Sequence, residues 1–330
     1  MFPILKIGKL MPKFPVIQGG MAVKVSTSSL ASAVAEAGGI GIIGASGMKA
    51  DEVAFEISKS KELSKGIIGI NIMVAVSNFL DVVKAAIAEK VDLIIAGAGF
   101  SKDLFKMGRD NGVEIVPVVS SLKVAALSQR LGASAVVVEG KDAGGHLGTN
   151  LSVREIFPEI KKELGIPVVA AGGLTTGQDI AEMFIMGADG VQLGSRFLMS
   201  EECDISPIFK EICLKAKEED MVLIQSPVGL KASAIKTSFV EKILAEDPEI
   251  RTKTCNACLK HCSHSFCILK ALVSAREGDT ENGLFFAGHD ICKINDILPV
   301  KEIIERLLSQ AHEIIEKHFN PLKKTVSAAL

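Results

Sequence analysis

Residues 167–194 read PVVAAGGLTTGQDIAEMFIMGADGVQLG and hold one complete strand–helix–strand unit. The β-branched run Pro167–Ala171 indicates a strand, and Gly177–Met186 has the apolar spacing of a helix. A second short strand is predicted over Gly190–Leu193. Neither strand alternates apolar and polar residues, which is typical of parallel strands that helices cover on both faces.

Predicted strands and helices alternate in this way from the amino terminus to residue 193. Apolar, β-branched runs recur at intervals of roughly 20–32 residues, the length of one strand–helix unit. Eight such units predict a (β/α)8 TIM barrel of the α/β class, and an open doubly wound sheet is the alternative. The predicted strands are Pro15–Gln18, Ile40–Gly44, Ile67–Met73, Leu93–Ala96, Glu114–Val118, Ala135–Glu139, Pro167–Ala171 and Gly190–Leu193. The predicted helices between them are Ser28–Ala37, Asp51–Leu63, Asn78–Glu89, Ser121–Leu131, Ser152–Leu164 and Gly177–Met186.

The chain beyond the eighth strand is interpreted as an addition to the barrel. A helix near Pro207–Glu218 is expected to close the barrel, which would then occupy residues 1–220. Residues 221–330 are expected to form a helical, cysteine-containing insertion or appendage that packs back on the barrel. The amphipathic segment Val300–Phe319 is predicted to be one of its helices.

Composition excludes several classes of protein. The chain has 330 residues, of which 48% are hydrophobic, and a net charge of −2, so it can bury a large core and has no basic field for nucleic acid. Its longest apolar stretch, around Gly66–Val76, is too short to cross a bilayer, and the amino terminus lacks a signal-peptide pattern. Seven cysteines in a chain of this size argue against a secreted disulfide framework. We therefore expect a cytoplasmic protein with no membrane partner.

Glycine clusters follow the last two predicted strands. Gly172 and Gly173 come after the seventh strand, and Gly194 and Ser195 come after the eighth. Barrel enzymes carry their chemistry at the carboxyl ends of the strands and often bind phosphate after strands seven and eight. Backbone N–H groups at a helix start attract an anion, and glycine lets phosphate oxygens approach. The clusters predict a phosphate-bearing ligand, with simple tight turns as the alternative.

Three polar residues stand at predicted strand ends or inside apolar strands. His146 lies among glycines after the sixth strand, and its near-neutral pKa suits proton transfer or hydrogen bonding to a developing charge. Glu139 ends that strand, where its carboxylate would contact a ligand or form a buried pair. Asn71 is an amide inside an apolar strand, so it needs a partner in a ligand or in a neighbouring loop.

Several motifs stand in order along roughly residues 10–240. They are Pro15-Val-Ile-Gln18-Gly-Gly-Met21-Ala22, Ala37-Gly-Gly-Ile-Gly41, Gly69-Ile-Asn71-Ile-Met73, Glu139 followed by Ala143-Gly-Gly-His146, and Ala170-Ala-Gly-Gly173 followed by Gly187-Ala-Asp-Gly-Val-Gln192-Leu-Gly194-Ser195. Together the motifs resemble the FMN-dependent nitronate monooxygenase family, formerly called 2-nitropropane dioxygenases. They equally resemble its close relative, enoyl-acyl-carrier-protein reductase II. The Ala-Gly-Gly-His element is the specific part of the resemblance.

The resemblance implies one FMN across the top of a barrel formed by residues 1–220. It implies that Gly20 and Met21 flank the isoalloxazine ring, and that Asn71 and Glu139 contact its polar edge or the ribityl chain. His146 would be the catalytic residue beside the flavin. The implied phosphate-binding residues are Gly172, Gly173, Gly194 and Ser195. The remaining cofactor-binding residues that the same motifs imply are Gly144, Gly145, Ala171 and Gln192.

The two related activities imply different partners. A nitronate monooxygenase oxidises an alkyl nitronate with O₂ and needs no nicotinamide, and this is the favoured interpretation. An enoyl-acyl-carrier-protein reductase takes hydride from NADH or NADPH through FMN and acts on a thioester carried by acyl carrier protein. A non-catalytic flavin-binding protein is a further alternative, which His146 disfavours. The sequence is compatible with a homodimer but contains no pattern that decides the oligomeric state.

A dense cysteine segment lies beyond the resemblance. Cys255, Cys258, Cys262 and Cys267 are separated by two, three and four residues. Thiolates at such spacing suit an iron-sulfur cluster or zinc. The alternative is that reduced thiols pack a small helical appendage.

Overall fold

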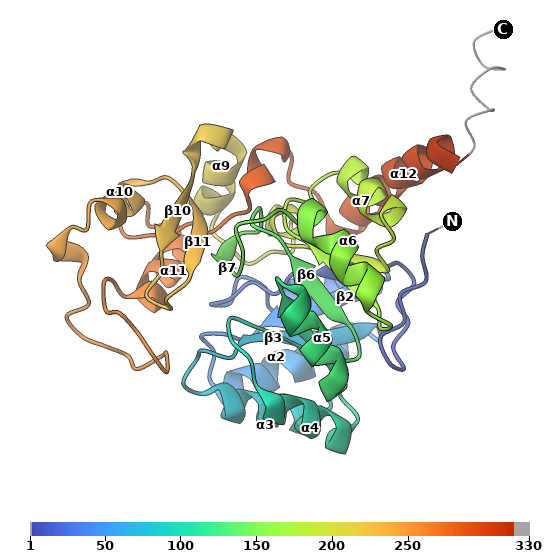
Figure 1. The fold of residues 1–330 in the computed structure, drawn as a ribbon. Coiled ribbons are helices and arrows are strands. Elements are labelled where there is room, and N and C mark those ends of the chain that lie inside the picture. Colours follow the sequence, from blue (N-terminus) through green and yellow to red (C-terminus); the bar gives the residue numbers. More distant parts are fainter. Residues whose placement is uncertain (1, 320–330) are drawn as a thin grey trace, which may run out of the picture.

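The barrel predicted from the sequence is confirmed by the computed structural model, which describes residues 2–319. Eight parallel strands close in the order β1-β2-β3-β4-β5-β6-β8-β9 (Figure 1). Each strand lies within two residues of its predicted bounds, because its apolar run is buried on both faces. The strands are β1 (Val16–Gln18), β2 (Ile40–Gly44), β3 (Ile67–Met73), β4 (Leu93–Gly97), β5 (Glu114–Val119), β6 (Val136–Glu139), β8 (Val168–Ala171) and β9 (Gly190–Leu193).

Helices separate successive barrel strands. Six of them agree with the predicted ranges to within one residue at each end, and Thr27, Ser152 and Thr176 accept backbone N–H groups at helix starts, as N-cap residues do. Helix α4 was not predicted, because its sequence KDLFKMGRDN is mostly polar. The helices are α1 (Ser28–Glu36), α2 (Ala50–Leu63), α3 (Phe79–Ala88), α4 (Lys102–Asn111), α5 (Leu122–Leu131), α6 (Val153–Glu163) and α7 (Gly177–Ile185).

The helix that completes the ring is not the predicted one. Helix α9 (Pro207–Lys215) packs on elements from later in the chain, whereas α12 (Val300–Phe319) lies against α7 and α1 (Figure 1). A Cβ on Gly177 would lie 2.4 Å from the Cβ of Gln310, so the glycine at the start of α7 lets α12 approach closely. The apolar stripe of α12 therefore belongs to the barrel. The division of the chain at residue 220 stays a prediction.

Between β9 and α12 the chain builds the accessory region, residues 218–293. The sequence predicted helices there, and the structure adds an antiparallel sheet in which the hairpin β10–β11 pairs with β7 from the barrel loop after β6. In Figure 1 this region, coloured yellow to orange, lies beside the barrel. Its elements are η1 (Glu218–Asp220) at its start, β10 (Met221–Gln225), β11 (Lys231–Ile235), α10 (Ser238–Leu244), η2 (Pro248–Ile250), α11 (Ile268–Glu277) and η3 (His289–Lys293). The partner strand β7 is Gly145–Leu147, and the short helix α8 after β9 is Ser195–Leu198.

The accessory region has its own apolar core. Phe266 is buried against Phe239 with ring centroids 5.8 Å apart, and Ile224 and Leu284 are buried in the same cluster. Within the described residues, no helix combines the length and the apolar composition that a membrane span requires. All seven cysteines lie in the described part of the chain and are free thiols.

Candidate active site

One cavity of about 260 Å³ opens at the carboxyl ends of the barrel strands. The residues predicted to bind cofactor or to act in catalysis all line it, although they come from six different strand ends or strands. They are Gly20, Met21, Asn71, Glu139, Gly144, Gly145, His146, Ala171, Gly172, Gly173, Gln192, Gly194 and Ser195. Their individual roles remain predictions.

Backbone geometry explains the glycines at the end of β8. Gly172 and Gly173 have φ values of 93° and 67°, a left-handed conformation that favours glycine. A Cβ on Gly173 would also lie 2.9 Å from the Cβ of Asp142. After β9, a Cβ on Gly194 would meet nothing within 4 Å, so this glycine borders open space. Backbone without side chains therefore borders the cavity at the ends of β8 and β9, and we call this surface the cradle.

An acidic side chain lies close to this cradle. Asp290 lines the cavity, and its Oδ2 would lie 3.6 Å from a Cβ on Gly173. The Nζ of Lys293 lies 2.8 Å from Asp290 Oδ2, which offsets the carboxylate charge that would otherwise repel an anion.

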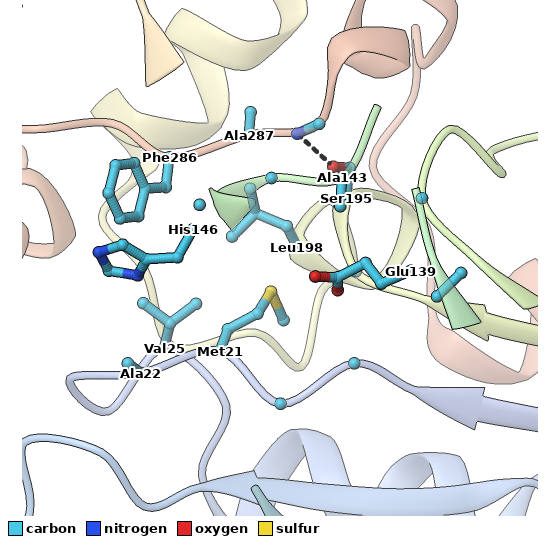
Figure 2. A pocket seen from close by; sticks show the side chains of 18 of the residues that line it. Met21, Ala22, Val25, Glu139, Ala143, His146, Ser195, Leu198, Phe286 and Ala287 are labelled. Atoms are coloured by element: carbon cyan, nitrogen blue, oxygen red, sulfur yellow. Dashed lines mark hydrogen bonds between the residues drawn. The ribbon is translucent and has the colours of Figure 1, made fainter. Parts of the chain in front are cut away.

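The opposite wall of the cavity begins with another glycine. A Cβ on Gly20 would lie 2.2 Å from the Cβ of Asn71, so only glycine lets the chain after β1 pass the Asn71 side chain. Met21 follows, and its backbone N–H donates to Ser26 Oγ at 2.9 Å, which holds the loop. Figure 2 shows the Met21 side chain facing the same space as Glu139.

Two polar groups of the cavity bear on what it can bind. Gln192 is 8% exposed, and among the described residues nothing hydrogen-bonds to its Oε1. Burial raises the pKa of Glu139 to about 7, because it disfavours the charged form. A buried acceptor without a partner, and a carboxyl whose protonated form burial favours, suit the N–H and C=O groups of a flavin ring. The residues present therefore fit FMN.

His146 occupies β7 rather than a free glycine loop, which corrects the expectation from the sequence. Its backbone pairs with Ala232 of β11, and its Nε2 lies 2.8 Å from the Oγ of Ser226. The ring packs edge-on to Phe286, with centroids 5.5 Å apart at 81° (Figure 2). Burial lowers the pKa of His146 to about 4, so the imidazole is neutral at pH 7.

Sequence reasoning missed the residues that the later chain brings to the cavity. Phe286, Ala287 and Gly288 close it from above, and Leu272 and Leu284 add apolar surface. The Gly288 N–H donates to Ser195 Oγ at 2.9 Å, which joins this segment to the predicted phosphate cluster. Gly288 could have been noticed in the sequence as a glycine that permits close backbone contact. Nothing in the sequence indicated which part of the barrel it approaches.

The cysteine segment docks on the loop after β3. Ser77 N–H donates to the carbonyl of Cys258 at 3.0 Å, and Lys260 N–H donates to the carbonyl of Ala75 at 2.9 Å. Cys255, Cys258, Cys262 and Cys267 all lie on this exposed to half-buried stretch. Across residues 2–319, however, no three side chains of His, Cys, Asp or Glu are placed so that they could hold one metal ion.

A sequence model described as nitronate monooxygenase matches residues 4–92 and 76–310, most of the chain. The chain belongs to the nitronate monooxygenase family. The family is one of FMN-dependent oxidoreductases, in agreement with the cradle and the buried polar groups described above. The chain is accordingly an FMN-dependent oxidoreductase.

Relatives of known name carry more than one activity. FabK from Thermotoga maritima is 35% identical in a comparison covering 93% of this chain and 96% of that one, with a TM-score of 0.85. A probable nitronate monooxygenase of Staphylococcus saprophyticus is 27% identical over 74% of this chain and 81% of its own length.

A third relative acts on a coenzyme A ester. The (3aS,4S,5R,7aS)-5-hydroxy-7a-methyl-1-oxo-octahydro-1H-indene-4-carboxyl-CoA dehydrogenase of Mycobacterium tuberculosis is 32% identical over 69% of this chain. The match spans 65% of that enzyme's length. The nitronate monooxygenase family thus contains this chain, while its relatives differ in substrate.

Proposed function

We propose that this chain oxidises small alkyl nitronates with O₂, using FMN bound in the barrel cavity. The observation that carries the proposal is the match of the nitronate monooxygenase model to residues 4–92 and 76–310, in a chain whose cavity lining fits FMN.

In this proposal, different lining residues contact different parts of FMN. Gly172, Gly173, Gly194 and Ser195 hold the phosphate, and Gln192 and Glu139 face the polar groups of the ring or the ribityl chain. Gly20 and Met21 pack on the ring. When bound, FMN supplies the electron transfer between the nitronate and O₂.

His146 is the residue that we assign to the substrate. Its ring lines the cavity and is neutral, and its Nε2 is engaged by Ser226. The remaining nitrogen, Nδ1, is available to a nitronate oxygen. A hydrogen bond in this half-buried site is stronger than one in water, because fewer water molecules compete for it.

Oxygen uptake tests the proposal. The purified protein is expected to be yellow, to contain one FMN per chain, and to consume O₂ when an alkyl nitronate is added. Activity should persist without NADH or NADPH. A yellow protein that consumes no O₂ with short-chain nitronates contradicts the proposed activity, and a colourless protein that binds no added FMN contradicts the cofactor assignment.

A second candidate is reduction of enoyl thioesters with NADH or NADPH, as in enoyl-acyl-carrier-protein reductase II. Two observations favour it: the 35% identity to FabK, and the apolar side chains Leu272, Leu284 and Phe286 in the lining of the cavity. This reaction would make acyl carrier protein a partner. A flavin-binding protein without activity is the remaining outcome, which requires that neither substrate class be turned over.

Metal binding by the cysteine segment is a separate proposal. The N–H of Ala257 donates to Cys255 Sγ at 3.3 Å, and the N–H of His264 donates to Cys262 Sγ at 3.4 Å, so two of the four sulfur atoms accept backbone hydrogen bonds. Binding an iron-sulfur cluster or zinc would require the four thiols to draw together. Iron, sulfide and zinc analysis of anaerobically purified protein tests this, and absence of all three supports free structural thiols. The expected homodimer and cytoplasmic location rest on the sequence alone.

A further inference from the structure

Ser226 is a buried residue outside the family motifs that contacts the ring of His146. It follows β10 in the turn to β11 and is 1% exposed. Its backbone is fixed at both ends, because its N–H donates to the carbonyl of Leu230 and its carbonyl accepts from Gly229, each at 2.9 Å. The hydroxyl therefore has a defined position, with Oγ 2.8 Å from His146 Nε2.

The direction of this hydrogen bond follows from counting protons. A serine hydroxyl has one proton to donate and two lone pairs that accept. Ser226 Oγ accepts from the N–H of Val228 at 3.3 Å. Among the described residues, the contacts of Oγ include no acceptor besides His146 Nε2. The hydroxyl proton is thus satisfied only when it points to Nε2, and Nε2 must then carry its lone pair.

A neutral imidazole carries one proton, so a lone pair on Nε2 places the proton on Nδ1. Nδ1 has no hydrogen-bond partner among the described residues, and the ring lines the cavity. The backbone pairing of His146 with Ala232 and the edge-on contact with Phe286 fix the plane of the ring. The Nδ1–H group is consequently left for a ligand in the cavity.

We propose that Ser226 is a positioning residue that holds His146 as the Nδ1–H tautomer, so that the ring offers the substrate a hydrogen-bond donor and no base. The proposal rests on the proposed function for its consequence: the chain acts on the nitronate anion, whose oxygens accept a hydrogen bond, and not on the neutral nitroalkane, which must first lose a proton. This assigns both the protonation state of the substrate and a role for the accessory hairpin.

The tautomer can be measured without any substrate. The chain contains six histidines, so nitrogen-15 NMR of the histidine-labelled, FMN-loaded protein, compared with the His146→Asn variant, identifies the His146 signals. We expect a protonated Nδ1 and an unprotonated Nε2 at pH 7. A protonated Nε2 overturns the proposal even if the protein oxidises nitronates, and the expected tautomer supports it even if the substrate is an enoyl thioester.

Kinetics test the consequence. Ser226→Ala removes only the hydroxyl and should lower kcat for nitronate by about 10-fold, the effect of one hydrogen bond of about 1.4 kcal/mol, with normal flavin content. Ser233→Ala is the matched control, because this buried serine lies on β11 opposite Gly145 and outside the cavity. It should keep the wild-type kcat.

Two substitutions of His146 distinguish the roles of its two ring nitrogens. His146→Asn places an amide near the position of Nδ1, whereas His146→Gln extends it toward that of Nε2. We expect His146→Asn to retain at least 10-fold more nitronate activity than His146→Gln. Equal activities, or an advantage for His146→Gln, contradict the assignment. The wild-type protein should also show no more than trace turnover of the neutral nitroalkane at a pH where the nitronate is not formed, and efficient turnover overturns the proposal.

Discussion

The backbones of Gly144 and Gly288 lie in contact: a Cβ on Gly144 would lie 2.8 Å from the amide nitrogen of Gly288. These residues are far apart in the sequence, one in the barrel loop after β6 and the other in the accessory region. Their contact places the segment Phe286–Gly288 over the cavity. The cavity is therefore a product of both parts of the chain.

Gly144→Ala should disturb this closure. The new Cβ would lie 2.7 Å from the carbonyl carbon of Ala287, so the backbone must move, at a cost of about 1–3 kcal/mol. We expect a lower melting temperature and faster loss of FMN during gel filtration. Gly165→Ala is the control, because its Cβ would meet only Gln129 Oε1 at 3.8 Å. Equal flavin retention in the two variants would argue against closure by this contact.

Gly173→Val tests the predicted phosphate cradle. A Cβ on Gly173 would lie 2.9 Å from the Cβ of Asp142, so the valine must displace the backbone at the end of β8, and we expect the protein to purify without flavin. Gly187→Val is matched for backbone strain, since Gly187 also has positive φ but a Cβ there would approach only Lys161, at 3.9 Å. Both variants should lose stability, and only Gly173→Val should lose FMN. Normal flavin content in the Gly173→Val variant would show that the phosphate does not bind at Gly173.

His146→Ala should separate binding from turnover. The phosphate cradle lies on other strands, so the flavin content should stay normal. Loss of a positioned hydrogen-bonding or proton-transfer group typically lowers rates by about 10²–10⁴. Rates at saturating substrate, with FMN measured on the same samples, check this. Full activity on nitronates and on enoyl thioesters would remove His146 from the mechanism.

Glu139 predicts a pH dependence of stability in the flavin-free protein. Its pKa is raised from 4.5 to about 7 by burial. Between these values the folded state keeps a proton that the unfolded chain releases, so stability falls as the pH rises from 4.5 through 7. The loss should approach about 3 kcal/mol. Urea unfolding at pH 5 and pH 8 measures it, and Glu139→Gln should remove most of the difference. If the difference in unfolding free energy between pH 5 and pH 8 is unchanged in that variant, other titratable groups cause it.

The barrel could be predicted because each strand carries its own signal. The run at Ile67–Met73 is apolar on both faces, and Gly172 and Gly194 mark the ends of strands, where chemistry lies in this fold. These local features do not depend on distant parts of the chain. They suffice to predict the barrel and the end of it at which the lining residues lie.

The remaining features depend on contacts between distant segments. The ring of helices is closed by α12 instead of α9, because Gly177 has no side chain and Gln310 of α12 can pack against it. No local sequence pattern reveals this contact. Likewise β7 is three residues long and becomes a strand only by pairing with β11. Ser226 reaches His146 through that pairing, so its role could not be inferred from its own surroundings in the sequence.

The anaerobic absorption spectrum tests the central claim most directly. The purified, flavin-loaded protein is mixed without O₂ either with an alkyl nitronate or with NADH or NADPH, and the visible flavin bands are followed. We predict that the bands bleach rapidly with the nitronate and persist with the reduced nicotinamides. Rapid bleaching by NADH or NADPH, with no response to nitronate, would contradict the account and identify the chain as a reductase.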